Sequence, residues 1–321
     1  MDINNIAITI LMSITTSIIL GRFIIPILRK QRIGQNIRDD GPQSHLAKQG
    51  TPTMGGVIIG LTLIIGLFIA RDFDLPLIIV LISTFCFGAV GFIDDFLGLI
   101  LKRSMGLDAK QKILLQIVFS IIMMMLLKRY NPTGFSIIRV PFINYDLGLG
   151  LFAYIYFPFL LIGTVNAVNL TDGLDGLLSS VTVPILPFLF VVAMGLGMTS
   201  IQSFILVLLG AILGFLVYNS NKASVFMGDT GSMTIGGAIA GLAIITNTTL
   251  FLPIFGIIYV IEAGSVIIQV ISYKTRNKKR VFLMSPIHHH YELKGHNEQK
   301  IVTAFTVVST IAVLLSTILY F

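Results

Sequence analysis

The chain has 321 residues, of which 55% are hydrophobic and 12% are charged, and its formal net charge at pH 7 is +7. Soluble domains carry about 25% charged residues, so this composition excludes an ordinary soluble protein and indicates a membrane protein. Cys86 is the only cysteine, which excludes intramolecular disulfides and cysteine metal sites. Because neither a repeat nor a low-complexity linker interrupts the sequence, we expect one membrane domain over residues 1–321.

Ten apolar segments follow one another along the chain. Each approaches, alone or with its flanks, the roughly 20 residues that a membrane-spanning helix needs. β-Barrel strands would be shorter and would alternate strictly, which these segments do not. The predicted fold class is therefore an all-α polytopic membrane protein with about ten transmembrane helices. The segments are residues 5–28, 53–71, 76–93, 113–127, 151–168, 177–197, 201–218, 233–247, 250–272 and 301–320.

Basic residues gather in alternate connections between these segments. The first, third, seventh and ninth connections hold most of them, whereas the opposite side holds only Arg71, Lys128, Arg129 and Arg139. The positive-inside rule makes the first set cytoplasmic, which places both termini on the extracytoplasmic side. Residues 134–148 alternate and carry turn residues, so we expect a small outer β-hairpin there.

The first two polar stretches of interest flank the second and third spans. DDGPQSHLAKQGTPTMGG (residues 39–56) is rich in turn residues, and its Lys48 and Thr53 could contact phosphate. GFIDDFLG ends the third span with the adjacent carboxylates Asp94 and Asp95. Neighbouring helical residues point about 100° apart, so one carboxylate could face a metal or phosphate while the other orients a neighbour. The alternative is an acidic pair without a task, although helix C-termini disfavour anions.

NAVNLTDGLDG (residues 166–176) is the most specific polar stretch. Asn169, Asp172 and Asp175 recur every three residues, so a helical turn would bring them to one face. Gly173 and Gly176 would permit the close approach of a ligand. A capped helix start with Asn169 as the cap is the alternative, but it leaves both carboxylates unexplained.

SVFMGDTGSM (residues 224–233) places Asp229 between glycines, just before a helix resumes. Thr230 and Ser232 could donate hydrogen bonds to phosphate, together with exposed backbone N–H groups. The stretch is not a Walker A loop, because no Gly-Lys-Ser/Thr follows. By itself, Asp229 is about as consistent with a turn cap as with a catalytic group.

The ninth span and the connection after it hold the remaining candidates. Glu262 is an acid within the span that needs a partner, with helix packing as its alternative role. Gln269 lies two turns further on nearly the same face. In MSPIHHHYELKGH, three consecutive histidines splay apart and make a poor zinc site, so binding of anionic ligand groups is favoured. They are His288, His289 and His290.

The alternation of connections places five aspartates, Asn169 and all five histidines on the predicted cytoplasmic side. The aspartates are Asp94, Asp95, Asp172, Asp175 and Asp229. Several acids on one membrane face predict a hard divalent cation, because Mg²⁺ takes carboxylates together with substrate phosphates. A secondary transporter also places acids in apolar helices, but near the bilayer midplane, whereas these acids lie at span ends. A purely structural membrane protein would have no reason to gather acids and histidines at one face.

Five stretches together resemble a known family. GPQSHLAKQGTPTMGG, GFIDDF, NAVNLTDGLDG, FMGDTGS and SPIHHHYE are similar, in order, to the signatures of the phospho-N-acetylmuramoyl-pentapeptide transferases. That family (MraY, or translocase I) belongs to the polyprenyl-phosphate N-acetylhexosamine-1-phosphate transferase superfamily. Superfamily members that move N-acetylglucosamine 1-phosphate share the acidic motifs, whereas the first and last stretches resemble the muramoyl-pentapeptide enzymes specifically.

The resemblance implies a ten-helix phosphoglycosyl transferase, commonly a homodimer, in the bacterial plasma (inner) membrane with its active site at the cytoplasmic face. It implies transfer of phospho-MurNAc-pentapeptide from UDP-MurNAc-pentapeptide to undecaprenyl phosphate, giving lipid I and UMP in peptidoglycan synthesis. Mg²⁺ would be the cofactor. The implied partners are these two substrates and membrane lipids, and no nucleic acid.

The resemblance also implies roles for individual residues. Asp229 matches the magnesium-binding aspartate, and Asp94 and Asp95 match the catalytic aspartate pair, the first proposed as base toward the lipid phosphate. The residues at the positions where the family builds its uridine pocket are Asp172, Asn219, Phe226 and Gln269, and Phe226 is available to stack on uracil. The residues at positions that the family uses for substrate or diphosphate binding are Lys48, Thr53, Lys110, His288, His289 and His290. The expected substrate-binding set is completed by Asn169, Gly173 and Asp175.

Two positions depart from the family pattern. Gly98 stands where the family often has a lysine, so one phosphate contact is missing or is supplied by Lys102, and Lys222-Ala223 replaces a usual Pro-Ala pair. A phosphate monoester has a second pKa near 6, whereas an unperturbed aspartate has a pKa near 3.9. We therefore expect Asp94 to act more through positioning and electrostatics than as a base. A two-step route through a phosphorylated aspartate stays open.

Overall fold

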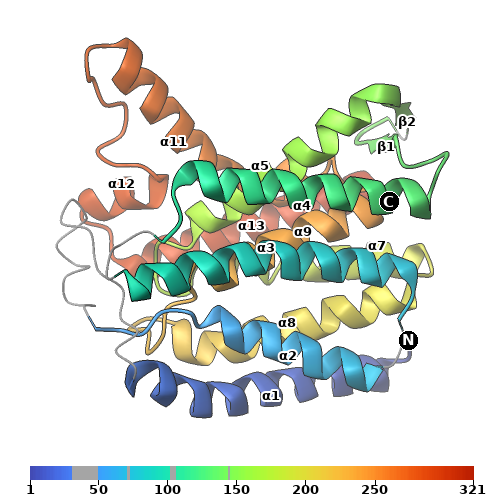
Figure 1. The fold of residues 1–321 in the computed structure, drawn as a ribbon, viewed down its shortest axis with the longest axis horizontal. Coiled ribbons are helices and arrows are strands. Elements are labelled where there is room, and N and C mark those ends of the chain that lie inside the picture. The colour runs from blue at the N-terminus through green and yellow to red at the C-terminus, as the bar shows by residue number, and fades with distance from the viewer. Residues whose placement is uncertain (31–49, 71–72, 102–105, 144) are drawn as a thin grey trace.

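The computed structural model describes residues 1–30, 50–70, 73–101, 106–143 and 145–321 as a helical bundle with one small hairpin (Figure 1). The helices before the hairpin are α1 (Ile3–Lys30), α2 (Gly56–Ala70), α3 (Leu75–Ile100) and α4 (Ala109–Tyr130). The hairpin strands are β1 (Ile137–Val140) and β2 (Tyr145–Gly148), followed by the 3₁₀ helix η2 (Gly150–Phe152). The later helices are α5 (Ala153–Thr171), α6 (Leu177–Thr182), α7 (Ile185–Gly195), α8 (Thr199–Asn219), α9 (Gly228–Ile245), α10 (Leu252–Phe255), α11 (Ile257–Thr275), α12 (Ile287–Leu293) and α13 (Glu298–Tyr320).

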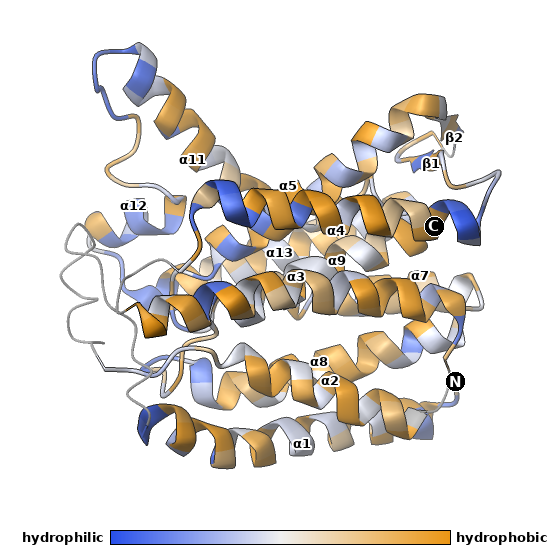
Figure 2. Ribbon diagram, in the orientation of Figure 1, coloured by the Kyte–Doolittle hydropathy of each residue, from blue (hydrophilic) through white to orange (hydrophobic). Residues whose placement is uncertain are grey.

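Each of the ten predicted apolar segments corresponds to a helix or to a consecutive pair of helices in the described residues, which confirms the all-α expectation. Eight helical stretches among these residues are long and apolar enough to cross a membrane, and α2 is a shorter apolar helix. Hydrophobic residues run along the helices, and hydrophilic ones concentrate toward helix ends (Figure 2). The number of spans and the side on which the termini lie stay predictions.

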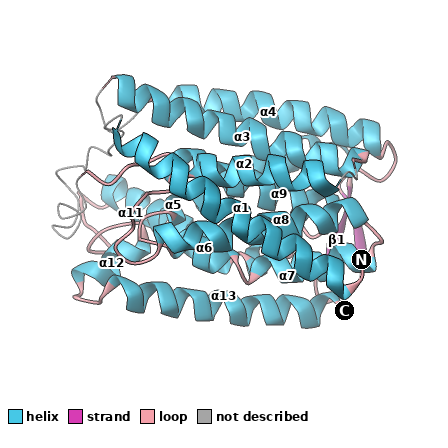
Figure 3. Cartoon of the chain, turned by 90° about the horizontal axis from the view of Figure 1, so that it is seen from below, coloured by secondary structure: helices cyan, strands magenta, loops and turns pink. Residues whose placement is uncertain are grey.

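The two ends of the bundle differ. Both termini and the hairpin lie at one end, whereas α12 and the C-terminal end of α1 lie at the other (Figures 1 and 3). The predicted hairpin is confirmed: β1 and β2 pair antiparallel, with Ile137 opposite Gly148 and Val140 opposite Tyr145. Both termini at one end agree with an even number of passes through the bundle.

The almost wholly buried α9 packs closely along α3, because glycines remove the side chains that would separate the two backbones. A Cβ added at Gly237 would lie 2.5 Å from the carbonyl oxygen of Ser83, and one added at Gly91 would lie 2.1 Å from that of Asp229. The Ser83 hydroxyl donates a hydrogen bond of 2.8 Å to the Gly237 carbonyl. This contact brings the C-terminal part of α3 beside the first turn of α9.

Two predicted local structures differ from the observed ones. The third span was expected to end at residue 93, but α3 continues to Ile100, so Asp94 and Asp95 lie within the helix. The prediction that Asn169, Asp172 and Asp175 share one helical face is wrong. Helix α5 ends at Thr171, and Asp172 caps it with ψ at +48°. Gly176 then has φ at +72°, a left-handed conformation that turns the chain before α6.

Candidate active site

Three carboxylates meet where α3 passes the first turn of α9. One oxygen from each of Asp94, Asp95 and Asp229 can be chosen so that all lie within 4.8 Å of one another, and all three residues are partly buried. The sequence predicted these residues as the catalytic set, and the fold brings them together. Like charges at this separation repel, so the arrangement needs positive charge or hydrogen-bond donors around it.

Asp95 caps the N-terminus of α9 from the neighbouring helix. Its carboxylate accepts hydrogen bonds from the backbone N–H of Asp229 (3.2 Å) and of Thr230 (2.9 Å), and from the Thr230 hydroxyl (2.6 Å). These N–H groups belong to the first helical turn, which has no intrahelical acceptors and carries the positive end of the helix dipole. Asp95 therefore fixes the backbone that carries Asp229.

The side chain of Asp229 is held by donors from two other helices. Asn169, near the end of α5, donates a hydrogen bond of 2.9 Å to one Asp229 oxygen and another of 2.8 Å to the Ser232 hydroxyl. Lys112, on α4, donates to the other Asp229 oxygen, and its ammonium nitrogen lies 3.9 Å from Asp94. Asp94 in turn accepts 2.9 Å from the Leu107 backbone N–H, just before α4. The cluster thus joins α3, α4, α5 and α9.

Lys112 is the member of this cluster that sequence reasoning missed. The sequence marks it only as one of the basic residues in the third connection, whereas the family resemblance implies a substrate contact for Lys110. Lys110 is exposed, and Lys112, two residues later, faces the carboxylates. The signal available in the sequence was the helical spacing, since residues two apart on a helix point to different faces.

The turn after α5 carries several of the predicted substrate-binding residues. Asp175 accepts a hydrogen bond of 3.0 Å from the Ala223 N–H. Asn219 accepts a hydrogen bond of 3.2 Å from the Gly176 N–H and donates one of 3.0 Å to the Val225 carbonyl. These bonds fasten the turn to the loop between α8 and α9. Burial raises the pKa of Asp172 well above its ordinary value, and the carboxylates of Asp229, Asp95 and Asp175 raise it further.

Thr53 and Phe226 are brought together by backbone pairing. The Phe226 N–H donates 2.8 Å to the Pro52 carbonyl, and the Phe226 carbonyl accepts 2.9 Å from Gly55. Thr53 is buried, and a Cβ at Gly228 would lie 2.7 Å from its hydroxyl and 2.6 Å from Asp95. Phe226 therefore lies three residues before Asp229 on a fixed strand-like segment. Lys48, the other residue predicted in this region, lies outside the described residues.

The predicted histidine and glutamine residues lie around α11 and α12. Gln269 accepts from the N–H groups of Val281 and Phe282 (2.9 and 3.0 Å) and donates to the Phe282 carbonyl, so it shapes the connection between the two helices. His289 pairs with Glu292 at 2.7 Å. His290 accepts 3.1 Å from the Leu283 N–H, and partial burial together with Lys294 lowers the pKa of its imidazole.

Glu262 has the partner that its sequence position called for. Its Oε1 lies 3.0 Å from Nδ1 of His288, and both side chains are fully buried. His288 is thus enclosed, unlike His289 and His290, which are partly exposed.

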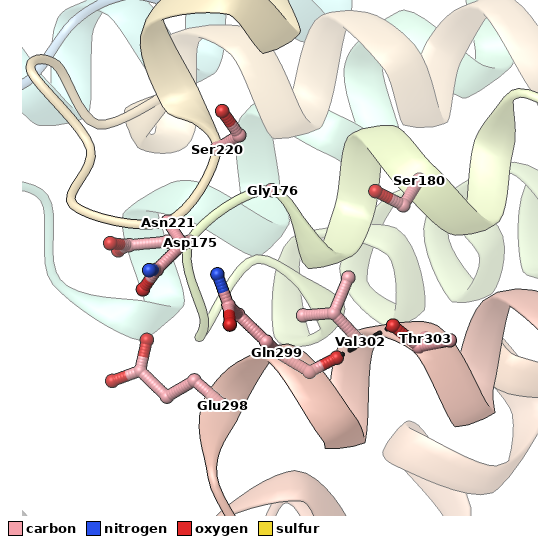
Figure 4. A pocket seen from close by; sticks show the side chains of 9 residues that line it. All are labelled: Asp175, Gly176, Ser180, Ser220, Asn221, Glu298, Gln299, Val302 and Thr303. Carbon is pink, nitrogen blue, oxygen red and sulfur yellow. Dashed lines mark hydrogen bonds between the residues drawn. The ribbon is translucent and has the colours of Figure 1, made fainter.

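A cavity of about 430 Å³ opens next to the turn 172–176, on the side of α13 (Figure 4). Asp175 and Asn221 contribute from one wall, and Glu298 and Gln299 contribute from the first turn of α13. None of the three clustered carboxylates lines it. The cavity therefore lies beside the turn rather than over the cluster.

The carboxylate cluster fits a hard divalent cation. Its oxygens are close enough to share one ion, they are partly buried, and they are the ligand type that Mg²⁺ prefers. Asp94 and Asp229 are the members with the fewest competing bonds, since Asp95 is engaged with the start of α9. The donor set thus suits a cation that also contacts a phosphorylated substrate.

Comparisons with known proteins show which family the chain resembles. A family model described as glycosyl transferase family 4 matches residues 77–247, and phospho-N-acetylmuramoyl-pentapeptide-transferase signature 1 matches residues 48–59. Curated relatives share the name phospho-N-acetylmuramoyl-pentapeptide-transferase. The one from Caldanaerobacter subterraneus subsp. tengcongensis is 46% identical over 314 residues, 98% of each chain. The one from Clostridium botulinum (strain Alaska E43 / Type E3) is 48% identical over 307 residues, 94% of this chain and 92% of the relative.

Proposed function

The chain belongs to the phospho-N-acetylmuramoyl-pentapeptide transferase family, and on that premise we propose that it transfers phospho-MurNAc-pentapeptide from UDP-MurNAc-pentapeptide to undecaprenyl phosphate. The products are lipid I and UMP, and the cofactor is Mg²⁺. The enzyme works as a homodimer in the bacterial inner membrane, with the reaction at the cytoplasmic face. The observation that carries the proposal is the cluster of Asp94, Asp95 and Asp229 with Lys112.

The cluster suits a reaction between two anionic phosphates. Bound Mg²⁺ supplies positive charge to the diphosphate of the nucleotide substrate. Asp229 and Asp94 would hold the cation, while Asp95 fixes the backbone of Asp229 through the first turn of α9. Preorganised charges of this kind need no rearrangement when charge develops at the reacting phosphate.

Lys112 supplies a second positive charge beside Asp229. Its ammonium contacts Asp229 and approaches Asp94, so it is placed to contact the diphosphate or the lipid phosphate. The lipid phosphate is largely dianionic at neutral pH. Asp94 therefore acts by positioning the reacting groups and balancing the charge of the cation and Lys112, and removal of a proton by Asp94 contributes little to the rate.

The turn 172–176 and its neighbours form the proposed nucleotide side of the site. Asp172, Gly173 and Asp175 contribute from the turn, while Asn219 and Gln269 fix adjacent loops. Phe226 provides an aromatic surface for uracil. Other groups proposed to contact the substrate or the diphosphate are Lys48, Thr53, Lys110, Asn169, His288, His289 and His290.

Release of UMP tests the proposal directly. Purified enzyme with UDP-MurNAc-pentapeptide, undecaprenyl phosphate and Mg²⁺ is expected to release UMP, and omission of the lipid or the metal should abolish release. Asp229→Asn should lower the rate by about 100-fold or more. Asp146→Asn, in the hairpin at the other end of the bundle, is the matched control and should leave the rate unchanged. A secondary transporter would release no UMP, and that result would refute the proposal.

A further inference from the structure

The buried pair of Glu262 and His288 leaves polar atoms without partners. Nδ1 of His288 lies 3.0 Å from Oε1 of Glu262, while Oε2 of Glu262 and Nε2 of His288 have no hydrogen-bond partner among the described residues. Both side chains are 0% exposed. Buried polar atoms are nearly always hydrogen-bonded, so this pair has a cost that helix packing alone does not explain.

The carboxylate determines how the imidazole is oriented. A carboxylate accepts hydrogen bonds, so Nδ1 of His288 carries the proton that is donated to Glu262. Nε2 then points away from α11, and the rotation of the ring is fixed by the Glu262 contact. A histidine whose one ring nitrogen is held by a carboxylate presents the other nitrogen in a defined direction.

That direction leads to the turn after α5. A Cβ added at Gly173 would lie 2.1 Å from Nε2 of His288 and 2.5 Å from its Cε1, so the ring edge rests directly on the Gly173 backbone. The φ angle of Gly173 is not positive, so any residue type could adopt its backbone conformation. Glycine is therefore needed at this position for the approach of His288 and not for the backbone conformation.

The contact holds the middle of a segment whose two ends are fastened separately. Asn169 ties its start to Asp229 and Ser232 on α9. Asp175 ties its end to Ala223 in the loop before α9. Between these points, Asp172 and Gly173 are supported from the α12 side by His288. The position of Asp172 thus depends on a chain of contacts that begins at Glu262.

We propose that Glu262 is a positioning residue of the transferase, which orients His288 against Gly173 and thereby fixes Asp172 on the nucleotide side of the site. The inference rests on the proposed function in one respect, namely that Asp172 contacts the nucleotide substrate. Among the described residues, neither Glu262 nor His288 is hydrogen-bonded to the carboxylate cluster. Their effect is expected on substrate binding more than on the rate of the bound complex.

The contact itself is tested without substrate. Gly173→Ala should lower the thermal unfolding midpoint in detergent, and the loss should largely disappear when His288→Ala is also present, because the added methyl group then has room. Gly163→Ala on α5 is the matched control, since a Cβ there meets no described residue within 4 Å. Equal losses for Gly173→Ala with and without His288→Ala would overturn the contact.

The orientation of the ring is tested by ¹⁵N NMR of histidine-labelled enzyme. The signal that disappears in His288→Asn belongs to His288 and should show a protonated Nδ1. Glu262→Gln should retain this signature, because the amide oxygen can still accept the bond, whereas Glu262→Ala should lose it. An unchanged signature in Glu262→Ala would overturn the role of Glu262.

Kinetics connect the contact to the reaction. Removing the partner of a metal-site histidine costs about 10- to 100-fold, and we expect Glu262→Ala to raise KM for UDP-MurNAc-pentapeptide by about tenfold, with a smaller change in kcat. Glu262→Gln should restore most of the loss. Ser265→Ala, one turn away, is the control and should match the wild type, because among the described residues its hydroxyl bonds only to the Glu262 carbonyl. An unchanged KM in Glu262→Ala refutes the positioning role, whereas absence of UMP release from the wild type refutes the proposed function alone.

Discussion

Lys112 donates a hydrogen bond to Asp229, although 117 positions separate the two residues in the chain. The ammonium nitrogen also lies 3.9 Å from Asp94. Its positive charge therefore offsets the repulsion between carboxylates that α3 and α9 hold together. A divalent cation bound by the same oxygens would compete with this ammonium, because both are attracted to the same charges.

Lys112→Met should separate the competition of the ammonium with the cation from the contribution of the ammonium to turnover. Without the competing ammonium, the dissociation constant for Mg²⁺ should fall by about tenfold, equivalent to about 1.4 kcal/mol, while turnover should fall by about 100-fold. Binding can be measured by Mn²⁺ electron paramagnetic resonance with Mg²⁺ competition. Lys110→Met, an exposed lysine on the same helix turn, should leave metal affinity unchanged. Weaker metal binding in Lys112→Met would contradict competition between the ammonium and the cation.

Thr230→Val should loosen the start of α9 while keeping the size of the side chain. The variant loses the 2.6 Å bond to Asp95, so the free energy of unfolding should fall by about 1 kcal/mol, and turnover should fall several-fold as Asp229 becomes less fixed. Thr62→Val is the control, because in the part of the chain that the structure describes that buried hydroxyl bonds only to the Ile58 carbonyl of its own helix. Equal activity in both variants would show that the cap does not position Asp229.

Asp94→Asn distinguishes positioning from proton removal. We expect turnover to be reduced at every pH, because the asparagine cannot supply the negative charge that balances the cation and Lys112. The measurement is the rate of UMP release between pH 6 and pH 10. Recovery of activity at high pH, where the lipid phosphate is fully deprotonated, would instead support a base role for Asp94.

Asp172→Asn should change how stability depends on pH. Because the pKa of Asp172 is raised in the folded protein, the folded state binds the proton more tightly than the unfolded state does. The stabilising contribution is therefore present at low pH and is lost as the pH rises through the folded pKa. The asparagine avoids this loss, so the unfolding midpoint of the variant should exceed that of the wild type increasingly above about pH 4. A difference that is constant with pH would contradict the raised pKa.

Gly237→Ala tests the close packing of α3 and α9. The added Cβ would lie 2.5 Å from a backbone oxygen of Ser83, which cannot move without shifting the helix, so a loss of about 1–3 kcal/mol is expected. A Cβ added at Gly264 on α11 meets none of the described residues within 4 Å. Gly264→Ala should therefore be neutral or slightly stabilising, because alanine favours helix. Thermal unfolding in detergent measures both. Similar midpoints would show that the two helices can separate freely.

Much of this protein could be predicted from its sequence, because the relevant signals are local. The lengths of the apolar segments gave the helices, and the alternation in residues 134–148 gave the hairpin. The short polar motifs gave Asp94, Asp95 and Asp229, which do meet. In each case a residue and its close neighbours in the chain carry the information.

Contacts between distant segments were decided by the tertiary structure alone. The spacing of Asn169, Asp172 and Asp175 suggested a helical face, but α5 ends at Thr171 and the glycines after it permit a turn. The turn is held by the contact of His288 with Gly173 and by the hydrogen bond from the Ala223 N–H to Asp175. Which lysine would face Asp229 depended on the rotation of α4 against α9. Likewise, Glu262 was visible as an acid in need of a partner, but only the folded chain places His288 beside it and Gly173 beyond. Charge and hydrogen-bond partners act through distances in space, and those distances are set when the helices pack.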